Sequence, residues 1–371
     1  MKKKLLLTAG GRAAALLLAP LYDALHQHDA YNPVALLVAP EGVEPVSREL
    51  AECFHLGESW QRLLLPQGTP VEQLAAAMTG LEKIFIAEEP DLVLVCGSDS
   101  VALATAVTAA KLGLRVAAVD AGLRSYERRD GEEVNRVVID AMAEFHFVSE
   151  HSGEYNLINE GVADEQVFFS GNLSIDSLVA LMEQANRDSV TALPGIAPKK
   201  YALVMLNPLG ASAAREPLEM MLRILGELAL KTTVVLPLLP GLEPLLRELG
   251  LESALREIEG VKLVEAPSHS VLLLLLRDSL LLVTDTEELQ SEATVMNVPC
   301  LTMLESCPRP STIEIGTNAL VGLDEAEILE HIKQILQPGA QKHLTSRSKI
   351  PEKWDGAAAS RIVAVLNRVL M

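Results

Sequence analysis

The fold is decided by residues 91–124, which read DLVLVCGSDSVALATAVTAAKLGLRVAAVDAGLR. The apolar run Leu92–Cys96 predicts a buried strand, Ser100–Lys111 has the length and periodicity of a helix, and a second apolar run follows at residues 115–119. A strand, a helix and another strand in this order are typical of a parallel sheet covered by helices. The stretch therefore predicts an α/β fold.

The same alternation occupies most of the chain. Before residue 186 it predicts further strands at residues 4–8, 33–38, 145–148 and 167–169, and helices at 13–26, 71–87 and 134–142. After residue 200 it predicts strands at 201–206, 232–236, 261–265, 280–284, 300–303 and 319–321, and helices at 216–229, 242–249, 271–276, 289–296 and 324–336. A polar stretch is expected after residue 339, before a last helix.

The segment 186–200 breaks this pattern with proline, glycine and charged residues, so it predicts an interdomain linker. We therefore expect an N-terminal Rossmann-like domain at residues 1–185 and a second one at 201–352. Residues 353–371 would form a helix that packs back on the first domain. Both domains would be doubly wound, and a ligand site is expected in the cleft between them.

Composition excludes several classes of partner. The 371 residues carry a net charge of −19, which argues against a nucleic-acid footprint and against anionic membranes. The start MKKKLLL imitates a signal peptide, but Gly10-Gly11-Arg12 interrupts it, and charges interrupt the apolar run at 271–283. We expect a cytoplasmic protein with no membrane segment. The cysteines show no metal-ligand spacing and fit a reducing cytosol: Cys53, Cys96, Cys300 and Cys307.

Two polar segments follow apolar strands about 160 residues apart. Residues 120–124 read Asp-Ala-Gly-Leu-Arg and are followed by 131–136, Gly-Glu-Glu-Val-Asn-Arg. Residues 284–293 read Thr-Asp-Thr-Glu-Glu-Leu-Gln-Ser-Glu-Ala. With Gly97-Ser98-Asp99, Ser170-Gly171-Asn172 and Gly316-Thr317, these motifs make the chain resemble the non-hydrolysing UDP-N-acetylglucosamine 2-epimerases, which share the two-Rossmann-domain GT-B fold.

The resemblance implies a reaction and a set of residues. Family members invert C2 of the sugar by eliminating UDP to leave an unsaturated sugar and adding it back from the other face. By resemblance Asp99, Asp120 and Glu132 would move the C2 proton, although Asp120 stands where the family usually has a glutamate. No metal and no cofactor is implied, and a homodimer in cell-surface polysaccharide biosynthesis is expected. The residues that would bind the UDP-sugar are Arg12, Arg136, Thr286, Glu292 and Arg309.

The chain departs from the family where the ligand would bind. The family's Gly-Thr-Arg-Pro-Glu loop and its later lysine are replaced at residues 10–14 and at Leu17. Its Gly-His-Arg-Arg-Glu motif is replaced by Leu-Asn-Pro-Leu-Gly-Ala at 206–211, and its Asp-Ser-Gly-Gly phosphate loop by Asp-Thr-Glu-Glu at 285–288. A glutamate held about 6 Å from a phosphate costs roughly 2–3 kcal/mol at an effective dielectric of about 20. Weak or lost activity is therefore predicted.

Several alternatives stay open. Asp99 could cap the helix after it, and Glu132 could form an ordinary i,i+4 ion pair with Arg136. His146 lies in a predicted strand and fits the core. The chain as a whole could be an epimerase, a catalytically inactive paralogue that serves as a binding or regulatory subunit with a protein partner, or an enzyme for a less phosphorylated ligand.

Overall fold

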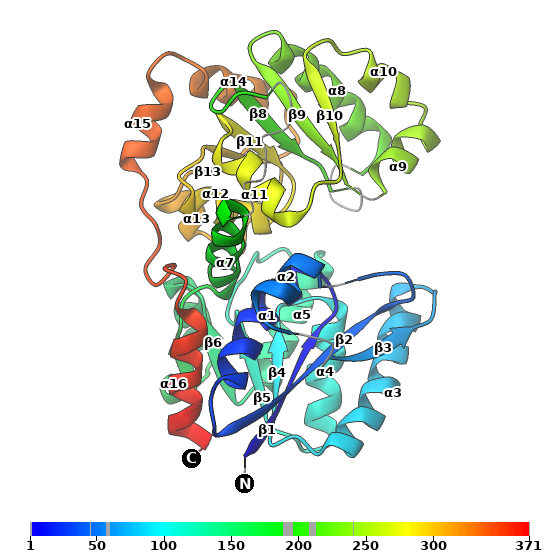
Figure 1. The fold of residues 1–371 in the computed structure, drawn as a ribbon, viewed down its shortest axis with the longest axis vertical. Helices are drawn as coiled ribbons and strands as arrows, with labels where there is room; N and C mark the ends of the chain where they lie inside the picture. Colours follow the sequence, from blue (N-terminus) through cyan, green and yellow to red (C-terminus); the bar gives the residue numbers. More distant parts are fainter. Residues whose placement is uncertain are drawn as a thin grey trace. The chain divides into compact units, whose positions relative to one another are not determined.

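The computed structural model describes residues 2–44, 46–56, 60–187, 196–207, 213–239 and 241–370. The chain forms two compact units (Figure 1). Unit 1 contains Met1–Leu181 and Glu352–Met371, and unit 2 contains Met182–Pro351. Helix α7 (Leu173–Arg187) continues past the boundary between them. Of the predicted linker at 186–200, residues 188–195 lie outside the described part of the chain.

Unit 1 is built on a seven-stranded sheet in which the paired strands are parallel, in the order β3-β2-β1-β4-β5-β6-β7. The strand order changes direction between β1 and β4, which pair from Leu5 with Leu92 to Thr8 with Val95. Ligands of doubly wound proteins bind at the carboxyl ends of strands beside such a switch point. The strands are β1 (Lys3–Ala9), β2 (Tyr31–Pro40), β3 (Gln61–Leu65), β4 (Leu92–Cys96), β5 (Val116–Val119), β6 (Phe145–Val148) and β7 (Val167–Phe169).

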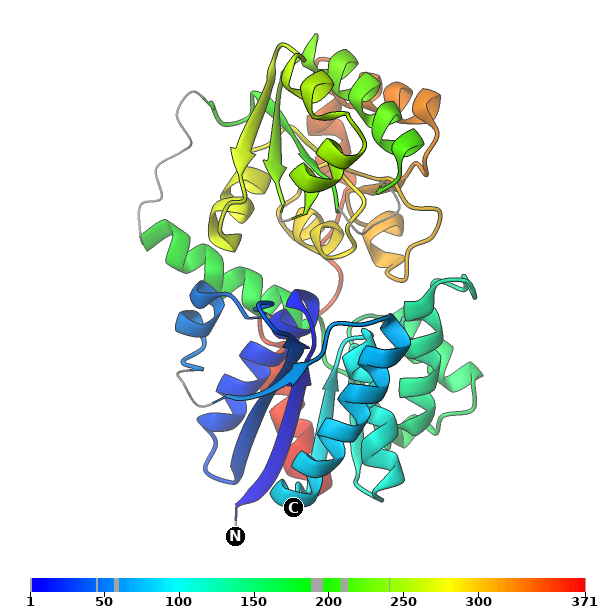
Figure 2. The same ribbon diagram turned by 90° about the vertical axis from the view of Figure 1, so that its right-hand side faces the viewer.

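Helices cover both faces of this sheet, which explains why its central strands are continuous apolar runs. Figure 2 shows α3 on one face and the C-terminal helix α16 behind the other. On the α3 face, Leu6 belongs to one apolar cluster with Leu81 and Ala102. The helices are α1 (Arg12–His26), α2 (Arg48–Cys53), α3 (Pro70–Glu88), α4 (Ser100–Lys111), α5 (Gly131–Met142), α6 (His151–Asn159), α7 and α16 (Ala358–Leu370), with a 3-10 turn at Asp164–Gln166.

The last helix is fixed to unit 1 by buried polar contacts. The Asp176 carboxylate accepts hydrogen bonds from the backbone N–H groups of Ala358 and Ala359 at 3.1 and 2.9 Å. The Trp354 indole, which is buried, donates to the Ser149 carbonyl at 2.9 Å. These contacts give hydrogen-bond acceptors to N–H groups at the start of α16 that have no partner within the helix, and they hold the segment before it.

Unit 2 repeats the architecture with a six-stranded parallel sheet in the order β10-β9-β8-β11-β12-β13. Its strands are β8 (Tyr201–Met205), β9 (Thr233–Leu238), β10 (Val261–Glu265), β11 (Leu281–Thr284), β12 (Cys300–Thr302) and β13 (Asn318–Leu320). Its helices are α8 (Arg215–Ala229), α9 (Leu242–Glu248), α10 (Glu252–Arg256), α11 (His269–Arg277), α12 (Glu288–Val295), α13 (Ser311–Glu314), α14 (Glu325–Ile335) and α15 (Ala340–Arg347).

The predicted fold class, two doubly wound α/β sheets, is confirmed. The polar stretch expected after residue 339 contains helix α15, which was not predicted. None of its side chains is buried, so it has no apolar face for periodicity to detect. Within the described ranges, no helix combines the length and apolar character needed to cross a bilayer.

Candidate functional site

Asp99 lies at the carboxyl end of β4, beside the switch point of unit 1. It is the N-cap of α4, and its carboxylate accepts from the Ala102 backbone N–H at 2.8 Å. The backbone N–H groups of Val101 and Gly10 also contact it. Burial raises the pKa of the Asp99 carboxyl, and the charge of Glu132 raises it further, against the lowering effect of these N–H groups. Asp99 therefore caps α4, as one of the alternatives predicted. Its carboxyl group also holds its proton more tightly than an ordinary aspartate does.

The same carboxylate explains the glycine at the end of β1. A Cβ atom at Gly10 would lie 2.8 Å from Asp99 Oδ2 and 2.5 Å from the Val101 side chain. At Gly11 the nearest contact would be Asp99 Oδ2 at 3.6 Å. Gly10 thus allows the β1 and β4 loops to approach each other. Arg12 is exposed and begins α1 directly after this loop.

Asp120 follows β5 in a left-handed backbone conformation, with φ of +67°. Aspartate adopts this region more readily than most residues. The next residues fix the turn, because the Ala121 N–H donates to the Phe147 carbonyl at 3.1 Å and Gly122 has φ of +76°. A Cβ atom at Gly122 would lie 2.4 Å from the Gly153 carbonyl oxygen. The predicted Asp120 site is therefore held by backbone packing on both sides.

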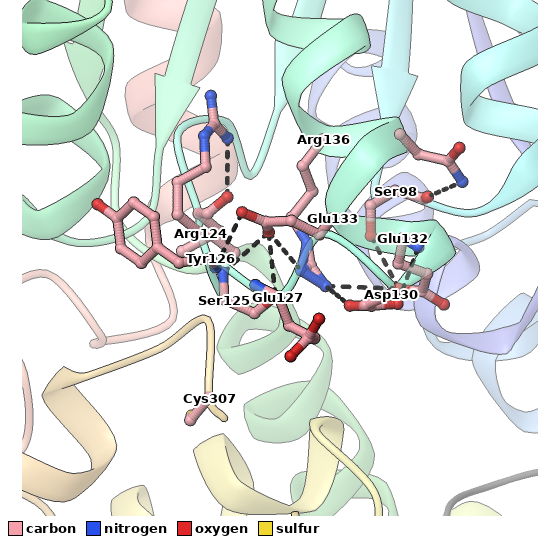
Figure 3. Close-up of polar contacts among 12 residues, drawn as sticks. Ser98, Arg124, Ser125, Tyr126, Glu127, Asp130, Glu132, Glu133, Arg136 and Cys307 are labelled. Carbon is pink, nitrogen blue, oxygen red and sulfur yellow. Dashed lines mark hydrogen bonds and ion pairs between the residues drawn. The ribbon is translucent and has the colours of Figure 1, made fainter. Parts of the chain in front are cut away.

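Glu132 lies in the first turn of α5, about half exposed, and its carboxylate accepts from the Ser98 hydroxyl at 3.0 Å (Figure 3). Its distance to the Arg136 guanidinium is 3.9 Å, longer than the 3.5 Å that separates Arg136 from both Asp130 and Glu133. The simple i,i+4 pair thus exists, but it is the longest contact of a buried arginine with three carboxylates. Ser98 and Asp130 were not among the predicted site residues.

Glu133, also missed by the sequence interpretation, organises the loop before α5. It is buried, and it accepts from the backbone N–H groups of Ser125 at 2.8 Å and Tyr126 at 3.0 Å (Figure 3). A signal was available in the sequence, because Glu133, Arg136 and Asp140 are spaced by three and four residues and so share one face of α5. Buried polar residues on this face of α5 support the loop that carries the candidate site residues.

Asp140 extends this buried face to the loop that follows β5. Its carboxylate lies 2.7 Å from the Arg124 guanidinium and accepts from the Gly122 N–H at 3.1 Å. Burial raises the pKa of the Asp140 carboxyl, and Arg124 opposes that rise. Arg124 also contacts Glu160 at 2.6 Å. His146, expected in the core, is buried, and its Nε2 lies 2.9 Å from the Asp140 carbonyl oxygen.

In unit 2, the carboxyl ends of β8 and β11 are joined beside the switch point. The Asn207 N–H donates to the buried Asp285 carboxylate at 2.7 Å. The Thr286 side chain turns back to Thr284, with 3.0 Å between the hydroxyl oxygens. The segment 206–211 differs from the family's Gly-His-Arg-Arg-Glu motif in the sequence analysis, and its residues 208–211 lie outside the described part of the chain. The loop after β11 is therefore tied to β8 through Asp285.

The two glutamates of this loop open α12. Glu287 is the N-cap and is half-buried, whereas Glu288 is the first helical residue and is exposed. Carboxylates at this end of a helix interact favourably with its dipole. Phosphate groups bind at the same end of a helix through backbone N–H groups, so this loop presents negative charge where a phosphate would bind.

Glu292 lies one turn further along α12 and is only 2% exposed. Its carboxylate is 3.1 Å from Nε2 of His269, a buried residue absent from the predicted site.

Arg309 is half-buried in the loop before α13, where its backbone N–H contacts Cys307 Sγ at 3.4 Å. The Cys307 thiol in turn donates to Gln290 at 2.9 Å. Across the described residues, no cluster of histidine, cysteine and carboxylate side chains could hold a metal ion.

Comparisons with known proteins identify the family. The sequence profile of the UDP-N-acetylglucosamine 2-epimerases matches residues 44–367. The chain belongs to this family. A UDP-N-acetylglucosamine 2-epimerase of Methanococcus maripaludis is 30% identical over 299 residues, 79% of this chain and 82% of that protein. That of Escherichia coli K12 is 28% identical over 378 residues, 99% of each protein.

The family's structures share the whole architecture. The crystal structure of the Methanocaldococcus jannaschii UDP-GlcNAc 2-epimerase in complex with UDP-GlcNAc and UDP has a TM-score of 0.86 and 26% identity, covering 98% of this chain and 99% of that one. The profile match includes all predicted site residues of this epimerase-family chain except Arg12. Departures such as Glu287 and Glu288 therefore lie inside the region that matches the family profile.

Proposed function

We propose that the chain is a UDP-N-acetylglucosamine 2-epimerase of weakened activity, which interconverts UDP-GlcNAc and UDP-ManNAc. In the first step a base takes the C2 proton and the C1–O bond to UDP breaks, leaving an unsaturated sugar. In the second step UDP adds back at C1 and a proton returns to the opposite face of C2. The roles of Asp99, Asp120 and Glu132 in this proton transfer are part of the proposal.

The observation that carries it is the acidic group beside the switch point of unit 1. Asp99 has a raised pKa and lies within the electrostatic influence of Glu132. Neighbouring carboxyls of which one holds its proton are suited to general acid and base roles. The Asp99 oxygens accept from backbone N–H groups, whereas Glu132 is half exposed and oriented by Ser98. We therefore propose Glu132 as the main proton-transfer group, with Asp99 and Asp120 assisting it.

On the nucleotide side, we propose that Arg12, Arg136, Thr286, Glu292 and Arg309 bind the UDP-sugar. Support for the nucleotide comes from the Methanocaldococcus jannaschii relative, whose complex contains UDP-GlcNAc and UDP. The glutamates at 287 and 288 oppose the pyrophosphate through like charge. The expected result is turnover limited by weak UDP affinity. The homodimer, the cytoplasmic location and the polysaccharide pathway remain predictions from the resemblance.

A second function is favoured by the same glutamates. Two carboxylates at the N-terminus of α12 suit a protein that no longer binds pyrophosphate, and such a paralogue would act as a binding or regulatory subunit with a protein partner. This alternative predicts that neither UDP nor UDP-GlcNAc binds at millimolar concentration.

Deuterium exchange separates the two functions. The protein is incubated with UDP-GlcNAc in D2O, and deuterium at C2 and formation of UDP-ManNAc are followed by NMR, with UDP binding measured by calorimetry. Exchange that disappears in E132Q but persists in E82Q, a control at an exposed glutamate of α3, supports the epimerase. Absence of both exchange and UDP binding in the unmodified protein would favour the inactive paralogue.

A further inference from the structure

A histidine contacts the chain at the point where it returns from unit 2 to unit 1. Unit 2 ends at Pro351, and Glu352 is the first residue of the returning part of unit 1. His151, the first residue of α6, lies 3.1 Å from the Glu352 carboxylate through Nε2. Its other ring nitrogen, Nδ1, lies 2.6 Å from the Glu154 carboxylate. One imidazole therefore contacts a carboxylate of its own helix and a second one that is 201 residues away in the sequence.

The residues that follow Glu352 are attached to unit 1 by contacts of their own. The Lys353 ammonium donates to the Phe169 carbonyl at 2.9 Å and lies 4.0 Å from the centre of the Phe169 ring. The indole of Trp354 is buried and hydrogen-bonded. The His151 ring packs against the same Phe169 ring, with 4.3 Å between the ring centroids. The imidazole is thus held beside the returning segment, and Glu352 is the residue of that segment whose contact depends on it.

Both contacts of His151 can be hydrogen bonds only while its ring carries two protons. An ionised carboxylate accepts and does not donate, and a neutral imidazole has a single N–H group. With one proton, the second ring nitrogen would direct its lone pair at a carboxylate. The contact with Glu154 is the shorter one and joins residues three apart on one helix. Neutral His151 should therefore keep Glu154 and lose Glu352.

We propose that His151 is a pH-dependent latch, which holds Glu352 while the imidazole is doubly protonated and releases it when the ring becomes neutral. The charged groups around the ring are Glu154 and Glu352, with Lys353 over the neighbouring Phe169 ring. The hydrogen bonds to Glu154 and Glu352 raise the pKa of His151 from 6.5, and partial burial opposes them. The folded protein thus binds this proton more tightly than the unfolded chain does. The contact is fully present below pH 6.5 and is lost as the pH rises through the raised pKa.

The test is an NMR titration of the full-length protein from about pH 5 to about pH 9, a range that includes the charge change of histidine. An exposed ion pair adds little to global stability, so the signals followed are local: the His151 ring and the backbone amide of residue 352. In the unmodified protein both should titrate with one midpoint above 6.5. In E352Q the His151 midpoint should decrease, because one of its two accepting carboxylates is gone. In H151F the amide of residue 352 should no longer titrate.

Two further variants separate the two carboxylates and control for charge. E154Q removes the partner on α6, so the His151 midpoint should decrease while the amide of residue 352 still titrates with it. E165Q is the matched control, because Glu165 is an exposed glutamate of the 3-10 turn before β7. The control removes the same charge without removing a partner of the ring, so both midpoints should stay as they are in the unmodified protein.

Each alternative result overturns the latch. A His151 midpoint at or below 6.5 in the unmodified protein would show that the two carboxylates do not hold the second proton. An equal decrease in E352Q and E165Q would reduce the effect to long-range charge. An amide of residue 352 that does not follow the His151 midpoint, or that titrates unchanged in H151F, would show that Glu352 is not released. These measurements need no UDP-sugar, so the latch and the epimerase proposal stand or fall separately.

Discussion

The carboxyl group of Asp176 should make the stability of unit 1 depend on pH. Burial raises its pKa from 3.8 to about 6, against the lowering effect of the Ala359 and Ala358 N–H groups, and the charge of Asp355 raises it further. The folded protein thus binds this proton more tightly than the unfolded chain does. The stabilisation is fully present below pH 3.8, and it is lost as the pH rises through 6.

The size of the effect follows from the two pKa values. Their difference corresponds to about 3 kcal/mol in the free energy of unfolding, of which about 2 kcal/mol falls between pH 4.5 and 7.5. The variant D176N cannot titrate. The free energy of unfolding of the unmodified protein minus that of D176N should therefore decrease by about 2 kcal/mol from pH 4.5 to 7.5.

Urea unfolding followed by tryptophan fluorescence measures this difference, because the buried Trp354 lies in the same C-terminal segment and reports on unit 1. D91N is the control. A hydrogen bond from Lys3 lowers the pKa of Asp91, so its contribution has the opposite sign and is lost as the pH falls. A difference for D176N that stays constant within about 0.5 kcal/mol over this range would refute the reasoning.

Three more predictions concern the site. E132Q should slow deuterium exchange at C2 by about a hundredfold or more while leaving UDP affinity unchanged, as calorimetry would show; a parallel loss of affinity would contradict a proton-transfer role. G10A should lower the free energy of unfolding by about 1–3 kcal/mol, because its Cβ would meet neighbouring side chains at 2.5–2.8 Å, whereas G11A should have a smaller effect in the same urea assay. The double variant E287G/E288G should bind UDP at least about tenfold more tightly, and unchanged affinity would show that these charges do not face the pyrophosphate.

Most of the fold could be predicted because strands buried on both faces of a parallel sheet have continuous apolar sequences. The run Leu92–Cys96 appears as a strand with the predicted bounds, and all of its residues are buried. β3 was missed because its sequence QRLLL begins with two polar residues and only Leu65 is buried, so it carries no continuous apolar run. Helix α15 was missed because none of its side chains is buried.

The pattern of strands points to candidate site residues where the end of one strand supplies them. Asp99 and Asp120 follow directly from the ends of β4 and β5. The residues that contact such groups come from other elements: His269 of α11 lies 3.1 Å from Glu292, and the Ser98 hydroxyl donates to Glu132. No spacing in a single sequence brings these pairs together, because their contact depends on tertiary packing.

At the start of α12, folding and phosphate binding favour different residues. Carboxylates in the first turn of a helix stabilise it by about 0.3–1 kcal/mol each, whereas glycine in a helix costs about 1 kcal/mol relative to alanine. Folding alone therefore favours Glu287 and Glu288 over glycines at the same positions. Glycine is useful at this turn when backbone N–H groups must approach a phosphate. A family member that carries two carboxylates here either binds UDP through its remaining contacts or has no need to bind it, and the E287G/E288G variant measures how much affinity that exchange removed.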